Sequence, residues 1–337
     1  PLARIVGAKP DEVVAMNTLT TNLHLLMVSF YRPQRERFKI VIEDTAFPSD
    51  SYAVQSQIEF HARHAGFNAR EGLIRLKPRS GEATLRTEDI LAALDRESES
   101  IALCMLGGVN YLTGQWFDMP EITRFARSKG IAVGWDLAHA AGNVPLQLHD
   151  WNVDFAAWCS YKYLNSGPGA VAGAFVHERH LAEPDLPRFA GWWGNDPATR
   201  FQMTPDFVPV ARADAWSLSN PPIFSTTPLV ESLALFDRAG GVPALRQKSL
   251  QLTGAMEAVA LAVPGVRIHT PREPGARGCQ LSLVLPGEAR SAHKRLTDEG
   301  VIADFREPNV VRVAPVPLYN SFEDVWRFGE ILRRVVG

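Results

Sequence analysis

The sequence predicts an α/β protein whose large, mostly parallel sheet is covered by helices on both faces. Short, continuously apolar segments alternate with helical segments over the first two thirds of the chain. Gly, Pro, Asn and Asp bound these segments, as is typical of buried strands between turns. Polar and ionisable residues follow several of the segments at the point where each ends. In parallel sheets that edge is where ligands bind.

The elements of this predicted sheet follow one another in a regular order. The apolar segments predict strands, and the segments between them predict helices with Ser, Thr or Asp at their starts. Thr18 is a candidate cap of the first helix, Ser49 or Asp50 of the second, and Thr87 of the third. Strands are expected at 39–43, 73–76, 101–106, 131–135, 155–159 and 170–176, and helices at 18–31, 52–64, 87–95 and 120–128.

The last third of the chain has a different pattern, which predicts a small α+β unit. Two helices, at 228–238 and 242–263, lead into it, and the second is long enough to link two domains. We therefore expect a large domain over residues 1–245 and a small C-terminal domain over 246–337. The small domain is expected to contain strands at 266–269, 280–285, 302–306 and 310–314 and helices at 292–298 and 322–336.

Composition narrows the class of protein. The chain has 337 residues, of which 46% are hydrophobic and 21% charged, the balance of a globular protein. A net charge of −2 gives no reason to expect binding to nucleic acid or to an anionic membrane. No apolar stretch approaches the length of a membrane span. Cys104, Cys159 and Cys279 are too widely spaced for a disulfide framework or a zinc site, so we expect no metal and a reducing, cytoplasmic location.

Lys162 lies just past the apolar segment 155–159. A lysine in such a place ordinarily extends to solvent. A lysine that is desolvated instead loses its charge, and the neutral amine can attack a carbonyl to form a Schiff base. Asp50, Asp136 and His139 also follow predicted strands, as does Asn110. Because several chance placements at one edge are improbable, we interpret Lys162 as functional.

These residue types together match the requirements of pyridoxal 5′-phosphate (PLP). A carboxylate keeps the pyridine nitrogen protonated so that the ring can accept electrons. A helix start with hydroxyl groups, as near Thr18 and Thr20, can hold the phosphate. Phe47 could stack on a planar ring. Arg312 or Arg306 in the small domain could bind a substrate carboxylate through a bidentate guanidinium.

Three other readings are weaker. Gly167-Pro168-Gly169 fits neither dinucleotide nor P-loop spacing, and it precedes a strand instead of a helix. Asp136 and His139 are three residues apart, but no further His or Cys has the spacing of a metal hydrolase site. A catalytically silent binding protein on the same fold would lack the need for a paired lysine and aspartate.

Eight motifs together resemble the kynureninase family. The resemblance runs from about Val13 to the C-terminus. It implies a type I PLP-dependent fold, and DLAHA alone would indicate only that broader fold. The motifs are MNTLT at 16–20, FPSD at 47–50, DLAHA at 136–140, WCSYKYLN at 158–165, GW at 191–192, SNPP at 219–222, RGCQ at 277–280 and RVAPVPLYNS at 312–321.

This resemblance implies a homodimeric PLP-dependent hydrolase of tryptophan catabolism or NAD biosynthesis. The enzyme would cleave L-kynurenine to anthranilate and L-alanine, or 3-hydroxykynurenine to 3-hydroxyanthranilate and L-alanine. Lys162 would form the Schiff base, with Tyr161 as proton donor and acceptor and Asp136 and Asp50 facing the pyridine nitrogen. The other positions implied are His139 and Phe47 at the ring, Leu19, Thr20, Ser49 and Tyr161 at the phosphate region, Trp192 and Asn220 from the partner subunit, Ser219 with Asn220 in the substrate pocket and Arg312 at the substrate α-carboxylate.

Three further features bear on this reading. Gly107 stands where the family often has a hydroxyl residue near the cofactor. The N-terminal segment that the resemblance implies is not within the printed sequence, and a chain that truly lacked it would be expected to lose activity. Ser219-Asn220 resembles the loop of members that favour 3-hydroxykynurenine. A cysteine desulfurase or an aminotransferase is the runner-up, although Cys279 beside an apolar run fits a structural role better than that of a mobile nucleophile.

Overall fold

The computed structural model describes residues 1–183 and 185–336, which form two compact units. The predicted domains, 1–245 and 246–337, include residues 184 and 337, which lie outside the described part. The division at residue 245 stays a prediction. The first unit comprises residues 1–77, 86–108 and 118–237, and the second comprises 78–85, 109–117 and 238–337.

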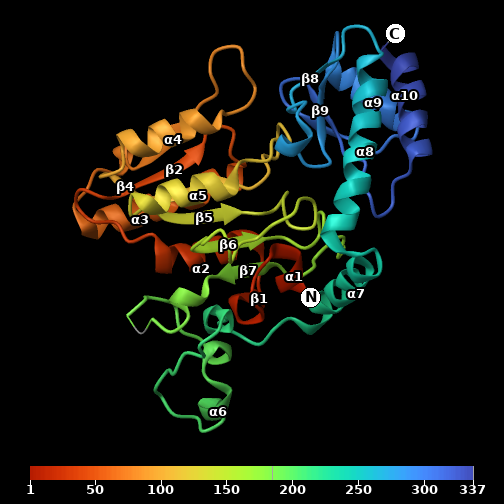
Figure 1. Ribbon diagram of the computed structural model, residues 1–337. Helices are drawn as coiled ribbons and strands as arrows, with labels where there is room; N and C mark the ends of the chain where they lie inside the picture. Colours follow the sequence, from red (N-terminus) through yellow and green to blue (C-terminus); the bar gives the residue numbers. More distant parts are fainter. Residues whose placement is uncertain (184, 337) are drawn as a thin grey trace. The chain divides into compact units, whose positions relative to one another are not determined.

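The first unit is built on a seven-stranded sheet with the order β1-β7-β6-β5-β4-β2-β3 (Figure 1). From β6 to β3 all neighbours are parallel, whereas β7 and β1 are antiparallel to the strands beside them. The predicted mostly parallel α/β sheet is therefore confirmed. The strands are β1 (Val13–Ala15), β2 (Lys39–Glu43), β3 (Leu73–Leu76), β4 (Ile101–Gly107), β5 (Ala132–Asp136), β6 (Phe155–Trp158) and β7 (Gly173–Val176).

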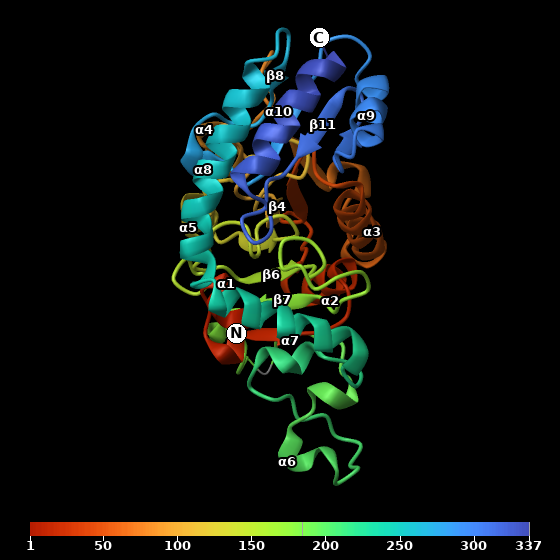
Figure 2. The same ribbon diagram turned by 90° about the vertical axis from the view of Figure 1, so that its right-hand side faces the viewer.

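Helices cover both faces of this sheet. Helices α2 (Leu19–Phe30) and α3 (Pro48–Ala65) lie on one side, and α4 (Thr87–Arg96) and α5 (Met119–Ser128) on the other (Figure 2). Burial on both sides explains why β4 and β6 are apolar throughout, since neither face of these strands meets water. The remaining α-helices of this unit are α1 (Leu2–Val6), α6 (Pro197–Arg200) and α7 (Ile223–Arg238).

The starts of two helices correct the predicted caps. Helix α4 begins at Thr87 itself, with Arg86 at the cap position, so the predicted capping role of Thr87 is wrong. Helix α3 begins at Pro48, whose fixed φ suits the first helical position. Ser49 and Asp50 therefore lie inside the first turn of α3 and do not cap it. The side chain of Ser49 instead contacts the hydroxyl of Thr20, and that of Asp50 contacts Asp136.

Two glycines let large aromatic side chains lie against the sheet. A Cβ at Gly134 in β5 would lie 2.1 Å from the ring of Phe155, and one at Gly173 would lie 2.3 Å from the ring of Trp158. Both rings are fully buried in β6. The close packing holds the strand that leads to Lys162 in a fixed position.

The second unit is a small α+β fold, as expected for the last third of the chain. Its four-stranded sheet has the order β10-β11-β9-β8, and all neighbouring strands are antiparallel. The core between this sheet and its helices includes Leu252, Leu283, Leu296 and Leu332. The elements are β8 (Arg267–Ile268), β9 (Leu281–Val284), β10 (Asp304–Arg306), β11 (Val310–Val313), α8 (Gly241–Leu261), α9 (Ala289–Asp298) and α10 (Phe322–Val336).

Two further observations concern the described residues as a whole. None of their helices combines the length and the hydropathy that crossing a bilayer requires. Cys104, Cys159 and Cys279 are all buried, and none of them forms a disulfide within the described residues.

Candidate active site

Polar groups gather at the carboxyl edge of the large sheet. Asp136 is the last residue of β5, and Lys162 comes four residues after the end of β6. Asp50 lies in the first turn of α3, which follows β2. Because β2, β5 and β6 run in the same direction, these three positions share one edge. The topology alone thus brings a lysine and two aspartates into one neighbourhood.

Lys162 lies beside an aromatic ring and close to a buried acid. Its Nζ is 5.7 Å from the centroid of the Phe47 ring, and its positive charge acts on the carboxyl group of Asp50. The Lys162 side chain is half-buried, so it is reachable by a ligand. The exposed Phe47 ring leaves a planar apolar surface next to the amine, which suits a flat aromatic cofactor.

Asp50 and Asp136 form a carboxyl pair. Both are 7% exposed, and their side chains are hydrogen-bonded to each other. Burial, followed by the charge and the hydrogen bond of Asp136, raises the pKa of Asp50 well above its usual range. The Oδ1 atom of Asp136 accepts a hydrogen bond from Ala138 N at 2.7 Å, which orients its carboxylate. A buried carboxyl pair of this kind could face a protonated ring nitrogen and stabilise its positive charge.

Glu43 is a third buried acid that the sequence prediction missed. It ends β2 and is 3% exposed, and its two carboxylate oxygens accept hydrogen bonds from Gly107 N at 3.2 and 3.3 Å. Its charge also helps to raise the pKa of Asp50. The rule that selected Asp50 and Asp136, a polar group at a strand end, applies equally to Glu43. Gly107, which has no hydroxyl group, thus uses its backbone amide to bind the carboxylate of Glu43.

The raised pKa of Asp50 predicts a pH-dependent stability. The pKa of Asp50 is higher in the folded protein than in the unfolded chain. Its contribution to the free energy of unfolding is therefore complete below the unfolded-state pKa and is lost as the pH rises through the folded-state pKa. Each pKa unit corresponds to about 1.4 kcal/mol. Asp50→Asn should therefore make the PLP-free protein more stable at pH 8 than the wild type, with little gain at pH 4.

This can be measured as urea midpoints of the PLP-free protein between pH 4 and 9. Asp44→Asn is the matched control, because Asp44 is an exposed acid in the same β2–α3 connection. A wild type that gains stability between pH 5 and 8 relative to Asp50→Asn would contradict the assignment.

The first turns of α2 and α3 meet through hydroxyl groups. Thr20 Oγ1 lies 2.8 Å from Ser49 Oγ, so the starts of the two helices adjoin. The hydroxyl of Thr18 is at the cap position but lies 3.0 Å from the Thr21 hydroxyl, and no side chain among the described residues caps α2. The N–H groups of the first turn, Leu19 included, remain available to an anion.

The residues before Lys162 also fit a bound polar cofactor. The hydroxyl of Ser160 is fully buried, and no hydrogen-bond partner for it exists among residues 1–183 and 185–336. An unsatisfied buried hydroxyl is costly, so a ligand group is the natural partner. The neighbouring Tyr161 is 50% exposed, and burial of its hydroxyl end, with Cys159 and Asp136 nearby, raises its pKa to about 12. Tyr161 is consequently protonated at neutral pH and can donate a proton.

Four further predicted site residues, His139, Trp192, Ser219 and Asn220, lie between β5 and α7 in the sequence. The ring of His139 lies edge-on to Tyr163 at 5.7 Å, one residue from Lys162. The indole nitrogen of Trp192 donates to Arg200 O at 3.3 Å. Ser219 and Asn220 are exposed in the connection before α7. Among the described residues, no hydrogen bond, ion pair or ring contact joins Lys162 to Trp192, Ser219 or Asn220.

Arg312 belongs to the second unit and already has partners. Its guanidinium forms an ion pair with Asp304, and Nη1 donates to Tyr111 O at 2.5 Å. Arg306 pairs with the same Asp304 at 2.9 Å. The Nε atom of Arg312 is buried and has no partner among the described residues. Asp304 therefore contacts part of the Arg312 guanidinium, and the pairing of Arg312 with a substrate carboxylate stays a prediction.

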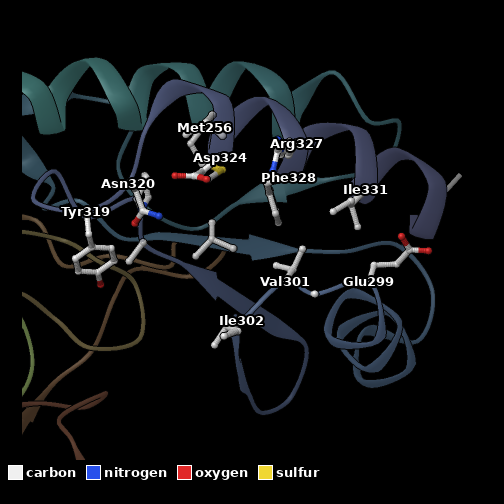
Figure 3. A pocket seen from close by; sticks show the side chains of 15 residues that line it. Met256, Glu299, Val301, Ile302, Tyr319, Asn320, Asp324, Arg327, Phe328 and Ile331 are labelled. Carbon is white, nitrogen blue, oxygen red and sulfur yellow. The ribbon is translucent and has the colours of Figure 1, made fainter. Parts of the chain in front are cut away.

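The second unit has a pocket of its own. Its volume is about 640 Å³, and its wall combines apolar side chains such as Met256, Ile302 and Phe328 with the polar side chains of Asn320, Asp324 and Arg327 (Figure 3). None of the predicted site residues lines it. It carries no lysine with which a cofactor could form a Schiff base.

Comparison with known proteins identifies the family. Residues 245–332 match the model of the kynureninase C-terminal domain. The chain is 59% identical to the kynureninase of Myxococcus xanthus over 98% of its own length and 77% of that protein, and 58% identical to that of Salinispora tropica over 100% and 78%. The chain belongs to the kynureninase family. Members of this family are PLP-dependent hydrolases that cleave carbon–carbon bonds, so the predicted family and enzyme class are confirmed.

Solved structures show the same fold at low sequence identity. The apo cysteine desulfurase of Thermococcus onnurineus has a TM-score of 0.79 at 19% identity, covering 99% of this chain and 81% of its own. The protein C-DES, with glycine covalently linked to its PLP cofactor, has a TM-score of 0.82 at 18% identity, covering 98% and 83%. At this identity the likeness concerns the fold alone. The predicted type I PLP-dependent fold is confirmed.

Proposed function

We propose that the carboxyl edge of the large sheet is the active site of a kynureninase that uses PLP. The reaction is hydrolysis of the Cβ–Cγ bond of L-kynurenine to anthranilate and L-alanine, or of 3-hydroxy-L-kynurenine to 3-hydroxyanthranilate and L-alanine. The observation that carries the proposal is the meeting of Lys162 with the buried Asp50–Asp136 pair, in a chain 59% identical to a kynureninase. A hydrolase of this kind needs both an amine for the cofactor and a fixed negative charge at its ring nitrogen.

The residues present fit PLP at each of its polar groups. Lys162 would bond to the aldehyde carbon, Phe47 would lie against the ring, and the Asp50–Asp136 pair would face the ring nitrogen. The first turn of α2, with Thr20, would hold the phosphate. Support comes from the start of α2, which no side chain among the described residues caps, and from the hydroxyl of Ser160, which has no hydrogen-bond partner among the same residues. Ser49 and Tyr161 would complete the phosphate region, His139 the ring hydroxyl, and Trp192 and Asn220 would reach the site from a second subunit.

When bound, PLP withdraws electrons from the substrate amine and acidifies the hydrogens at Cα and then at Cβ. Lys162, with its amine free and uncharged, would be the base that takes the Cα proton of the substrate. The negative charge of the Asp50–Asp136 pair keeps the ring nitrogen protonated. Water adds to the γ-carbonyl carbon, and the Cβ–Cγ bond then breaks. Tyr161, whose hydroxyl is protonated at neutral pH, supplies the proton that Cβ needs as the bond breaks.

Arg312 is proposed to bind the substrate α-carboxylate. Its guanidinium would either release Asp304 or bind the substrate carboxylate and Asp304 at the same time. A lysine at this position keeps the charge but loses the planar fork. Arg312→Lys should therefore raise KM for kynurenine by about 10-fold or more while kcat changes less. Steady-state kinetics with kynurenine would test this. Arg306→Lys is the matched control, since Arg306 pairs with the same aspartate, and an equal rise in KM there would remove the special role of Arg312.

The preference for kynurenine or 3-hydroxykynurenine depends on the pocket around the aromatic ring of the substrate. Ser219 and Asn220 are exposed and are proposed to line the substrate pocket of the partner subunit, with 3-hydroxykynurenine as the favoured substrate. Turnover of kynurenine and of 3-hydroxykynurenine, followed by fluorescence of the aromatic product, tests both the activity and the preference. Turnover of neither substrate by full-length, PLP-loaded protein would reject the proposed function.

A homodimer is proposed as the active form, in the cytoplasm. The support is a run of large apolar side chains that lie exposed between residues 189 and 230. An exposed apolar surface of this kind is typical of a subunit interface. The side chains and their exposed fractions are Phe189 (59%), Phe201 (73%), Met203 (75%), Ile223 (74%), Phe224 (94%) and Val230 (59%).

A further inference from the structure

Three metal-ligating side chains lie together at the edge of the large sheet opposite to Lys162. Glu12 immediately precedes β1, His149 lies six residues before β6, and His177 immediately follows β7. Strands β1, β7 and β6 are neighbours, and β7 is antiparallel to the other two (Figure 1). The start of β1, the start of β6 and the end of β7 therefore meet at one edge. Lys162 follows the other end of β6, so this group is not part of the proposed active site.

The ligand atoms of these side chains converge. One oxygen of Glu12 and one nitrogen of each histidine lie within 4.8 Å of one another. His149 Nδ1 is 2.9 Å from Glu12 Oε1, His177 Nδ1 is 3.8 Å from the same oxygen, and the two rings stack at 4.9 Å. Ligands of a tetrahedral zinc ion lie roughly 3.3–3.5 Å apart, from metal–ligand distances of about 2.0–2.2 Å. Small side-chain shifts would bring all three into range.

Each of the three groups is also held by an outer partner. Glu12 is fully buried, and its carboxylate accepts hydrogen bonds from Lys9 N and Glu178 N, both at 2.8 Å. His177 Nε2 lies 3.2 Å from the carbonyl oxygen of His149, which places the ring proton on Nε2 and leaves a lone pair on Nδ1. The Nε2 atom of His149 lies 3.9 Å from Glu178 Oε1. Oriented imidazoles of this kind, with a carboxylate or carbonyl behind the ring, are typical of metal sites.

We propose that Glu12, His149 and His177 bind one zinc-type divalent cation. Two imidazole nitrogens and one carboxylate oxygen suit zinc, whereas calcium and magnesium prefer oxygen ligands. The ion binds His149 Nδ1 in the neutral ring form whose single proton is on Nε2, and it replaces the hydrogen bond that Arg179 N donates to His177 Nδ1 at 3.2 Å. The side chain of His149 is 23% exposed, which leaves a path for the ion and for a water as fourth ligand. The bound ion fastens the segment before β1 to the ends of β6 and β7.

The test is a zinc titration of the full-length, PLP-loaded protein against a chromophoric chelator, after removal of bound metal. One zinc per chain should bind, and zinc should raise the melting temperature. His149→Gln and His177→Gln should each lower the zinc affinity at least 100-fold and abolish the rise in melting temperature. Their cofactor absorption should stay unchanged, which shows that the variants are folded and that cofactor binding does not depend on this site.

His180→Gln is the matched control. His180 lies in the same short segment as His177 but pairs with Asp154 and Glu183. It should bind zinc like the wild type. Wild-type protein that binds no stoichiometric zinc, or variants of His149 and His177 that bind it as tightly as the wild type, would overturn the proposal. Cobalt substitution gives a second readout, because tetrahedral coordination by these ligands produces visible absorption that both variants should lose.

Discussion

Replacing Lys162 by alanine is expected to abolish the covalent attachment of PLP and to lower turnover of kynurenine by roughly 10³-fold or more. The loss is large because one side chain is proposed to have two roles, as the covalent anchor and as the base at Cα. The variant should still bind PLP non-covalently through the phosphate and ring contacts. Borohydride reduction followed by peptide mass spectrometry measures the attachment directly.

Lys129 is the matched control for Lys162, because it lies near an aromatic ring but, among the described residues, not near a buried carboxyl pair. Lys129 Nζ also lies near an aromatic ring, 5.4 Å from the centroid of Phe125, but it forms an ion pair with Asp95 at 2.6 Å. No buried carboxyl pair is associated with Lys129 in the described residues. Lys129→Ala should therefore keep both the reduced adduct and the turnover. A reduced adduct that maps to any lysine other than Lys162 would refute the assignment.

Replacing Tyr161 by phenylalanine is expected to keep the covalent attachment of PLP and to lower turnover by about 10²–10⁴-fold. The substitution removes one hydroxyl group and leaves the ring. With a pKa of about 12, that hydroxyl remains protonated across the physiological range, so it is a donor and not a base in the resting enzyme. Turnover should fall through kcat, because the missing proton is needed after the substrate has bound.

Two measurements separate this role from a structural one. The absorption of bound PLP and the borohydride adduct should match the wild type, while kcat falls. Tyr52→Phe is a suitable control, since Tyr52 is 72% exposed on α3 and has no proposed role. If Tyr161→Phe retains wild-type kcat, the proton donor is another group.

The strands were predictable from the sequence because burial on both faces makes them continuously apolar. The segment 39–43 was expected as a strand and is β2, and the expected segments 101–106 and 155–159 correspond to β4 and β6. Helix starts were less predictable, because Pro48 and Thr87 satisfy the rules for more than one position of the first turn. The helix at 52–64 therefore begins four residues earlier than expected.

The part of the site that lies at the ends of parallel strands was predictable from the sequence. Lys162, Asp136 and Asp50 follow parallel strands, so their meeting follows from topology. The pairing of Arg312 with Asp304 was not predictable, because it depends on side-chain contacts across an antiparallel ladder. The group formed by Glu12, His149 and His177 was missed for a similar reason. Its members are far apart in sequence, and no short spacing marks them.

The most direct test of the central claim follows the oxygen atom that hydrolysis introduces. Full-length, PLP-loaded protein is incubated with L-kynurenine in water labelled with oxygen-18, and the products are analysed by mass spectrometry. Cleavage of the Cβ–Cγ bond by water predicts equal amounts of L-alanine and anthranilate, with one labelled oxygen in the anthranilate carboxyl group. Consumption of kynurenine without alanine, or anthranilate without the label, would contradict the account.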